Sequence, residues 1–197
     1  MPKAPDLRQK VLKASLALIE EGGLDPLSMR EAARKAGVSH QAPYHHFADR
    51  EAILAPIAGK VSSSSDRRSC AQPPTRAPIP AKAMGRAYVD FAMRHPAYFQ
   101  VMFRADAVPL DRYPEPRKLE DEAFGRLVEG IDKAFTDQPI EVRRKIAVTA
   151  WALVHGLATL ILEGSLARKV GIPKTRQKQL ADEVIGTFLS LLERRGS

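Results

Sequence analysis

The sequence predicts an all-α protein with a small three-helix unit at the N-terminus and a larger helical part at the C-terminus. Apolar residues recur at three- and four-residue spacing along most of the chain, which is typical of helices that bury one face. Strands would show long alternation of β-branched and polar residues, and the sequence has none. The composition, 44% hydrophobic but only 6% aromatic, agrees with Ala- and Leu-rich helices. We expect one domain over residues 1–54, a connector over 55–80 and a second domain over 81–197.

The first helix should begin after Asp6, whose carboxylate can cap the free amides of the first turn, and end near Gly22. Lys3, Arg8 and Lys10 lie around that first turn, where they either contact phosphates of a nucleic acid or form an ordinary charged helix end. The inner face of the helix is apolar apart from one serine: Val11, Leu12, Ser15, Leu16, Leu18 and Ile19.

The second helix has a start signal and a stop signal. Ser28 is a good N-cap, and Glu31 three residues later completes a capping box. Gly37 can close the helix in the left-handed region. Between them, the apolar positions share one face: Met29, Ala32, Ala33 and Ala36.

A third, short helix follows from about His40 to Phe47. Val38 should fill the small core before it, and Ser39 should cap this helix. The second helix and this short helix, joined by a short turn, have the form of a helix-turn-helix. We call residues 39–47, the short helix with its cap, the reader segment. Leu24, Leu27 and Phe47 should close the core of this three-helix unit.

The reader segment carries an unusually polar surface for so short an element. In a major groove, Gln41 can pair with adenine, serine and histidine can bond to bases or phosphates, and Tyr44 can donate to a phosphate. Pro43 can contact a thymine methyl. Asp49 should cap a further helix with Ile53, Leu54 and Ile57 inward, and Arg50, at its start, is placed for a phosphate.

These residues resemble the signature of the TetR family of transcriptional regulators. The match consists of a Gly-Val-Ser turn, a helix ending in Tyr-x-His-Phe and a basic residue after a short loop: Gly37, Val38, Ser39, Tyr44, His46, Phe47 and Arg50. The resemblance implies a DNA-binding regulator, with Arg50 in place of the usual lysine at a phosphate contact. The resulting DNA-contact candidates are Ser28, Arg30, Ser39, His40, Gln41, Tyr44, His45, His46 and Arg50.

Residues 58–80 depart from that family, in which a long helix usually connects the DNA-reading and sensing parts. Four serines weaken helix in the middle of this segment, and four prolines forbid a continuous helix at its end. We expect the connecting helix to end early and a loop to follow to about Ile79.

The C-terminal part should contain further amphipathic helices, at residues 81–95, 97–103, 115–135, 140–162 and 177–194. The helix over 140–162 is hydrophobic around much of its circumference, which implies burial on more than one side. The last two helices have surplus apolar surface. They predict a four-helix bundle shared between two copies, and a two-fold pair suits the reading of a palindromic operator.

A pocket between these helices is the natural place for a small apolar ligand. The order Trp151-x-x-x-His155-Gly156 resembles the sensing domain of one TetR subgroup, and Gly156 should allow close helix approach. His155 needs a polar partner on an otherwise apolar helix. Taken singly, each candidate is more often a core residue than a ligand contact, and this includes His155. The candidate pocket residues are Tyr88, Phe91, Phe99, Met102, Phe103, Phe124, Trp151 and His155.

Other function classes find little support. The sequence has no glycine-rich phosphate loop, no G-x-S-x-G turn and no paired His and Cys arrangement, so we expect no enzyme and no cofactor. The histidines at 40, 45 and 46 lack Cys or carboxylate partners at helical spacing, so we expect no metal. The single Cys70, the absence of an apolar signal region and the absence of a membrane-length apolar run predict a cytoplasmic protein.

The net charge of +8 suits a nucleic-acid partner, but its distribution weakens the argument. Residues 1–54 carry 8 basic and 7 acidic side chains, whereas residues 55–86 carry 6 and 1. The excess therefore lies mostly in the connector. Two hypotheses remain. The first is a ligand-responsive regulator, which we expect to be a repressor, and the second is a helical adaptor whose helix-turn-helix is only structural.

Overall fold

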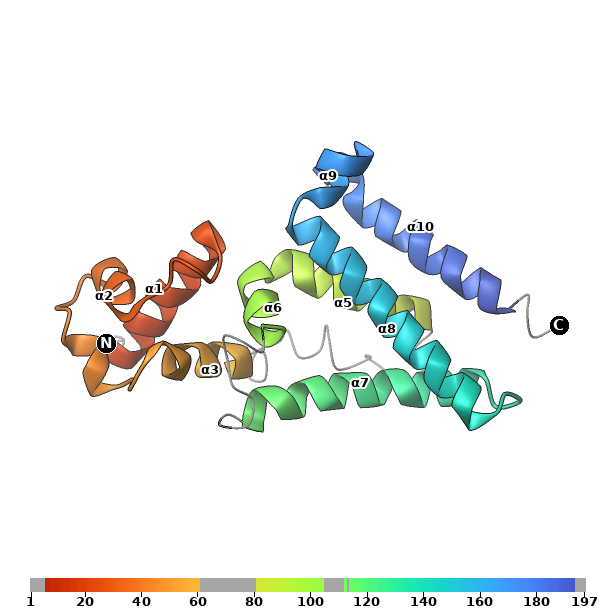
Figure 1. The fold of residues 1–197 in the computed structure, drawn as a ribbon, viewed down its shortest axis with the longest axis horizontal. Helices are drawn as coiled ribbons and strands as arrows, with labels where there is room; N and C mark the ends of the chain where they lie inside the picture. The colour runs from red at the N-terminus through yellow and green to blue at the C-terminus, as the bar shows by residue number, and fades with distance from the viewer. Residues whose placement is uncertain (1–5, 61–80, 105–111, 113, 194–197) are drawn as a thin grey trace, which may run out of the picture. The chain divides into compact units, whose positions relative to one another are not determined.

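A computed structural model of the chain describes residues 6–60, 81–104, 112 and 114–193 (Figure 1). Every regular element in those ranges is helical, which confirms the all-α prediction. The elements are α1 (Leu7–Gly22), α2 (Met29–Ala36), the 3₁₀ helix η1 (Ala42–His45), α3 (Arg50–Lys60), α5 (Ala81–Arg94), α6 (Pro96–Met102), α7 (Pro114–Ala134), α8 (Ile140–Leu162), α9 (Ser165–Val170) and α10 (Lys174–Glu193). They divide into two compact units, residues 1–64 with 95–120, and residues 65–94 with 121–197.

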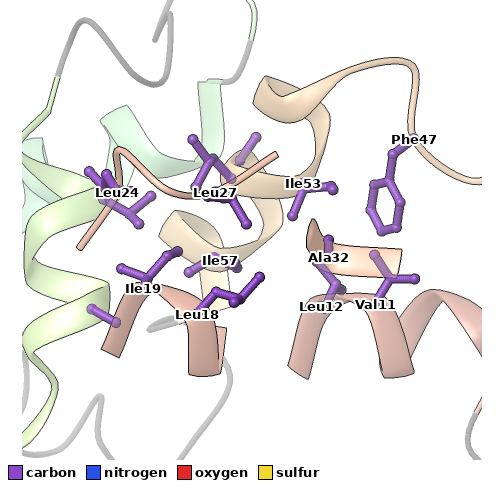
Figure 2. Packing of buried hydrophobic residues seen from close by; sticks show 14 of the residues in the cluster. Val11, Leu12, Leu18, Ile19, Leu24, Leu27, Ala32, Phe47, Ile53 and Ile57 are labelled. Atoms are coloured by element: carbon purple, nitrogen blue, oxygen red, sulfur yellow. The ribbon is translucent and has the colours of Figure 1, made fainter. Parts of the chain in front are cut away.

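The first unit has a core built where α1, α2 and α3 meet. Figure 2 shows apolar side chains of these helices facing one another, among them Val11, Ala32 and Ile53. Leu24, Leu27 and Phe47 are also buried there, as the sequence predicted. Burying each such side chain contributes about 1.5–3 kcal/mol, so this core is what holds η1 at the surface of the unit.

Three of the expected helix ends are present in the structure. The hydroxyl oxygen of Ser28 accepts the Glu31 amide at 3.1 Å, and the carboxylate of Asp49 accepts the Ala52 amide at 2.8 Å. Gly37 ends α2 with φ of +68°, in the left-handed region that favours glycine. These caps fix where α2 and α3 begin and where the turn before η1 opens.

Two other expected caps differ. Asp6 precedes α1 but makes no side-chain cap bond, and Gln41 rather than Ser39 occupies the N-cap position of η1, also without such a bond. Of the expected capping box of α2, the bond from the Glu31 amide to Ser28 is present, while the Glu31 carboxylate accepts from Arg34.

The second unit is held by α5 packed against α8 and α10. Its core includes Val89 of α5, Leu157 of α8 and Ile185 of α10. The helices approach closely at Gly85, since a Cβ there would lie 3.2 Å from Val154 and from Ile185.

Gly156 does not play the role expected of it. A Cβ built at Gly156 meets nothing within 4 Å, so close helix approach within the chain occurs at Gly85 instead. The sequence also missed α9, which lies between Gly164 and Gly171, both with positive φ. The helix expected from residue 177 begins earlier, at Lys174.

α6 packs with the first unit rather than with the helices that follow the connector. Ala97 and Val101 are buried in the same core as α1 and α3, and Tyr98 and Met102 pack against it. Packing therefore crosses the domain boundary that we expected at residue 81. The predicted loop after the early end of the connecting helix lies outside the described residues, beyond Lys60.

The expectation that no apolar run of the chain reaches membrane length is wrong. Within the described ranges, α8 is long and apolar enough to cross a membrane, judged by length and composition alone. Core helices of soluble proteins meet the same criterion, and α8 contributes Ile146, Leu157 and Ile161 to buried clusters of the second unit. Only 28% of its most apolar stretch is buried, however, so α8 leaves apolar surface uncovered.

Candidate nucleic-acid interface

The reader segment turns its two apolar anchors inward and its polar side chains outward. Pro43 and Phe47 are buried, Phe47 in the core of the first unit. Tyr44 is 55% exposed. Its polar neighbours are exposed as well: Ser39, His40, Gln41, His45 and His46.

The burial of Pro43 shows that the expected contact of its ring with a thymine methyl is wrong. A ring that is almost fully buried cannot contact a thymine methyl in a groove. Pro43 instead anchors η1 to the core. Its backbone carbonyl also accepts the amides of His46 and Phe47, both at 2.9 Å.

The regular part of the reader segment is shorter and tighter than the expected helix from His40 to Phe47. η1 spans only Ala42–His45 and uses i to i+3 bonds, such as Tyr44 N–H to Gln41 O at 3.1 Å. Proline lacks an amide and its ring crowds the carbonyl four residues before it, which disfavours an α-helix across Pro43. The polar side chains thus project from a single turn and its flanks.

α2 adds a charged surface next to the reader segment. Arg30 and Arg34 are exposed and lie four residues apart, so they share a face of the helix. The Glu31 carboxylate accepts from Arg34 Nε at 2.9 Å and from Nη2 at 2.6 Å. The hydrogen bond from Arg34, with the nearby charges of Arg34, Arg30 and His40, lowers the pKa of Glu31, and the same bond raises the pKa of Arg34.

Two arginines expected near phosphates have other partners. The Arg50 Nη2 donates to the backbone carbonyl of Leu24 at 2.6 Å, and the residue is half-buried. The guanidinium of Arg8 lies over the Phe47 ring, 5.4 Å from its centroid. Lys10 is exposed, and Lys3 lies outside the described residues. Neither arginine contact could be predicted from a local pattern, because each depends on how the three helices fold together.

This surface offers amide, hydroxyl, phenol and imidazole groups on one turn, backed by exposed guanidinium groups on α2. Such groups bond to base edges and to phosphate oxygens, and a rigid core holds them. Three of the histidines lie here, yet no group of three or more His, Cys, Asp or Glu side chains in the described part of the chain is placed to hold a metal ion.

Two family models match the chain. The model of bacterial regulatory proteins of the tetR family matches residues 11–57, and the tetracyclin repressor-like C-terminal domain matches residues 81–188. The second match alone covers more than half of the chain. The chain belongs to the TetR family.

Several known proteins are similar to this TetR-family protein over most of its length. The transcriptional repressor KstR of Rhodococcus jostii is 28% identical over 163 residues, which are 77% of this chain and 76% of KstR. A solved protein of unknown function from Rhodococcus sp. RHA1 is 28% identical with a TM-score of 0.67, covering 93% of this chain and 97% of that one. The TetR-family regulator PfmR of Thermus thermophilus, 16% identical with a TM-score of 0.65 and covering 92% and 95%, shares the fold.

The family match makes this TetR-family protein a DNA-binding transcriptional regulator. Its helix-turn-helix lies within the matched residues 11–57, and the exposed reader segment is the central part of that match. The contact residues themselves remain predictions.

The eight pocket candidates fall into two groups. Phe99, Met102 and Phe103 lie on or next to α6, in the first unit, where the tilted rings of Phe99 and Phe103 have centroids 4.9 Å apart. The other five lie in the second unit: Tyr88, Phe91, Phe124, Trp151 and His155. The structure therefore does not gather all eight around one point within a single unit.

Four of the five residues in the second unit form a connected aromatic cluster. The Tyr88 hydroxyl and His155 Nδ1 are hydrogen-bonded at 2.9 Å, which provides the polar partner that His155 was expected to need. Trp151 lies between His155 and Phe124, with ring centroids at 6.1 and 5.5 Å. Burial lowers the pKa of His155, so its imidazole is neutral near pH 7. Phe91, the fifth residue, is buried and lies on α5 like Tyr88.

Proposed function

We propose that this TetR-family regulator is a repressor that binds a palindromic operator as a homodimer and is released by a small apolar ligand. The observation that carries the proposal is the outward display of every polar side chain of the reader segment above an apolar anchor. A helix-turn-helix that served only as scaffold would have no need of such a surface. The repressor KstR, the curated relative, supports repression rather than activation.

Within the reader segment, the contact roles follow from side-chain chemistry. Gln41 suits adenine, Tyr44 suits a phosphate, and the serine and histidine side chains suit bases or phosphates. Arg30 is exposed one turn into α2 and can reach a base or a phosphate. We place Ser28 at the margin, because its hydroxyl oxygen already caps α2, and leave Arg50 out of the contact set.

Homodimer formation is supported by the uncovered apolar surface of α8 and α10. Val148 and Leu160 on α8 are 53% and 40% exposed, and Leu191 on α10 is 57% exposed. Val148, Ala152, Gly156 and Leu160 follow one another at four-residue spacing, which forms a ridge that a second helix can pack against. A pair of copies would cover this surface and present two reader segments to one duplex.

Ligand release is supported by the aromatic cluster of the second unit. Tyr88, Phe124, Trp151 and His155 are all half-buried, so each keeps part of its surface accessible. Aromatic walls with one hydrogen-bonded pair are typical of sites for small apolar molecules. We propose these four residues as the wall of the ligand site and place the protein in the cytoplasm, as a regulator without enzymatic activity.

The test uses Gln41→Ala and Tyr44→Ala in the full-length protein. A duplex is first selected from a random-sequence library by the unaltered protein, and the affinity of each variant for it is measured by fluorescence anisotropy. Each substitution should weaken binding by about 1–3 kcal/mol, roughly fivefold to 150-fold, at unchanged melting temperature.

The matched control is Lys13→Ala, an exposed change on α1 outside the reader segment, which should leave affinity within about twofold. If the selection yields no preferred sequence, or if both reader variants bind as the unaltered protein does, the protein does not read DNA through this segment. The structural adaptor would then be the better description.

A further inference from the structure

The two stretches that flank the helix-turn-helix in sequence are joined in space by one side chain. The helix-turn-helix runs from Ser28 to Phe47; Leu24 lies just before it and Arg50 just after it. Arg50 Nη2 donates to the Leu24 carbonyl at 2.6 Å across 26 residues of sequence. The two flanks are therefore fixed to each other at a point outside the reader segment.

The carbonyl that Arg50 reaches is itself part of a tight turn. Leu24 O also accepts the Leu27 amide, at 3.2 Å, and Gly23 enters this turn with φ of +78°. The residue after Leu27 is Ser28, the cap of α2. The position of the turn thus decides where α2 begins.

Arg50 is half-buried, and part of its guanidinium group is committed inside the unit. Its Nε is buried and has no hydrogen-bond partner among the described residues. Arg50 is the first residue of α3 and directly follows the Asp49 cap. A buried guanidinium nitrogen is not presented to a phosphate on the surface. Arg8, over the Phe47 ring, is a second arginine that supports the reader segment from within the unit.

We propose that Arg50 is a positioning residue for DNA reading: it fastens the Leu24–Leu27 turn to the start of α3 and so sets the angle between α2 and η1. The inference rests on the proposed reading of DNA through residues 39–46. It assigns Arg50 a role different from the phosphate contact that sequence resemblance implied.

A positioning role and a phosphate contact predict different binding data. Loss of a phosphate contact weakens specific and non-specific binding alike and lowers the salt slope of log K by about 1. Loss of a positioning bond weakens specific binding while non-specific affinity and the salt slope stay unchanged, because the phosphate contacts themselves remain.

The experiment compares the full-length protein with Arg50→Met, which keeps an apolar stem but removes the donors. Each is titrated with the selected duplex and with a scrambled duplex over a series of potassium chloride concentrations. We expect specific affinity to fall about tenfold, with the scrambled duplex bound normally and the salt slope retained. Hydrogen exchange should also accelerate at the Leu27 amide. The control is Lys13→Met, which removes one exposed charge from α1 and should change neither the affinity ratio nor that exchange rate.

Arg50→Gln serves as the second variant should Arg50→Met fail to fold, since it replaces the guanidinium with a shorter neutral donor and should show the same pattern more weakly. A salt slope reduced by about 1, with both duplexes weakened, would establish a phosphate contact and overturn the proposal. Unchanged specific affinity at a lower melting temperature would also overturn it, because the bond would then serve stability alone. If the unaltered protein itself prefers no duplex, the proposed function fails. The hydrogen-exchange rate at the Leu27 amide then still tests whether the bond from Arg50 to the Leu24 carbonyl holds the Leu24–Leu27 turn.

Discussion

Ser28 and Ser39 show how two serines in similar sequence settings come to have different roles. Each precedes a helical segment, and sequence alone assigns a cap to both. The Ser28 hydroxyl caps α2, whereas η1 has no side-chain cap and the exposed Ser39 is available to a partner. The difference arises because η1 begins at Ala42, two residues later than a helix capped by Ser39 would.

The serine roles can be separated by alanine substitution. Ser28→Ala should lower the free energy of unfolding by about 1 kcal/mol, since one first-turn amide of α2 loses its acceptor. Ser39→Ala should change it by less than about 0.5 kcal/mol and weaken binding to the selected duplex instead. Urea denaturation at one protein concentration, together with anisotropy, gives both numbers. Equal stability losses would show that Ser39 also caps.

His155 predicts how stability depends on pH. Burial lowers its pKa in the folded protein, so on acidification the unfolded chain takes up this proton first. The free energy of unfolding should therefore decrease as the pH falls below the ordinary histidine value of about 6.5. His155→Gln, which does not titrate there, should reduce that decrease, as measured by urea denaturation at pH values on either side.

Exposed His45 provides the matched control for that measurement. His45→Gln should leave the pH dependence as it is in the unaltered protein, because the side chain lies on the surface of the reader segment. A dependence that is the same with and without His155 would mean that burial of this imidazole does not influence stability.

At the scale of elements, helix ends that depend on local signals could be predicted from the sequence, whereas several tertiary contacts could not. The ends of α2 depend on Ser28 and Gly37, which act within one turn, so sequence placed them correctly. α9 has six residues between two glycines, too short for a periodic pattern to show. The inward turn of Pro43 and Arg50, and the packing of α6 with α1 and α3, depend on distant partners that no local pattern reveals.

The close packing of α5 can be tested at its glycine. In Gly85→Ala the new methyl group would lie 3.2 Å from the half-buried side chain of Val154 and the buried side chain of Ile185. Overpacking of this kind costs about 1–3 kcal/mol, which outweighs the gain of up to about 1 kcal/mol from replacing a helical glycine. Gly125→Ala on α7, where a Cβ meets nothing within 4 Å, should be neutral or stabilising. Similar urea midpoints for the two variants would contradict the packing described for Gly85.

At the scale of the whole molecule, the proposed function requires a second copy that would cover α8 and α10. Leu160→Glu places a charge on the exposed ridge of α8, and Leu191→Glu does so on α10. Because a charge at a desolvated interface is costly, each should shift the protein toward monomer, seen by sedimentation velocity, and weaken binding to the selected duplex. Val170→Glu, on the exposed end of α9, is the control and should leave both unchanged. Dimers that persist in both variants would place the interface elsewhere.

Hydroxyl-radical footprinting of the full-length protein on its selected duplex tests the central idea most directly, namely that paired reader segments recognise one operator. Two protected patches related by two-fold symmetry should appear, their centres about one helical turn of DNA, roughly 34–36 Å, or a multiple of it, apart. Tyr44→Ala should weaken both patches together. A single patch, or protection spread evenly along any duplex, would contradict reading by a two-fold pair.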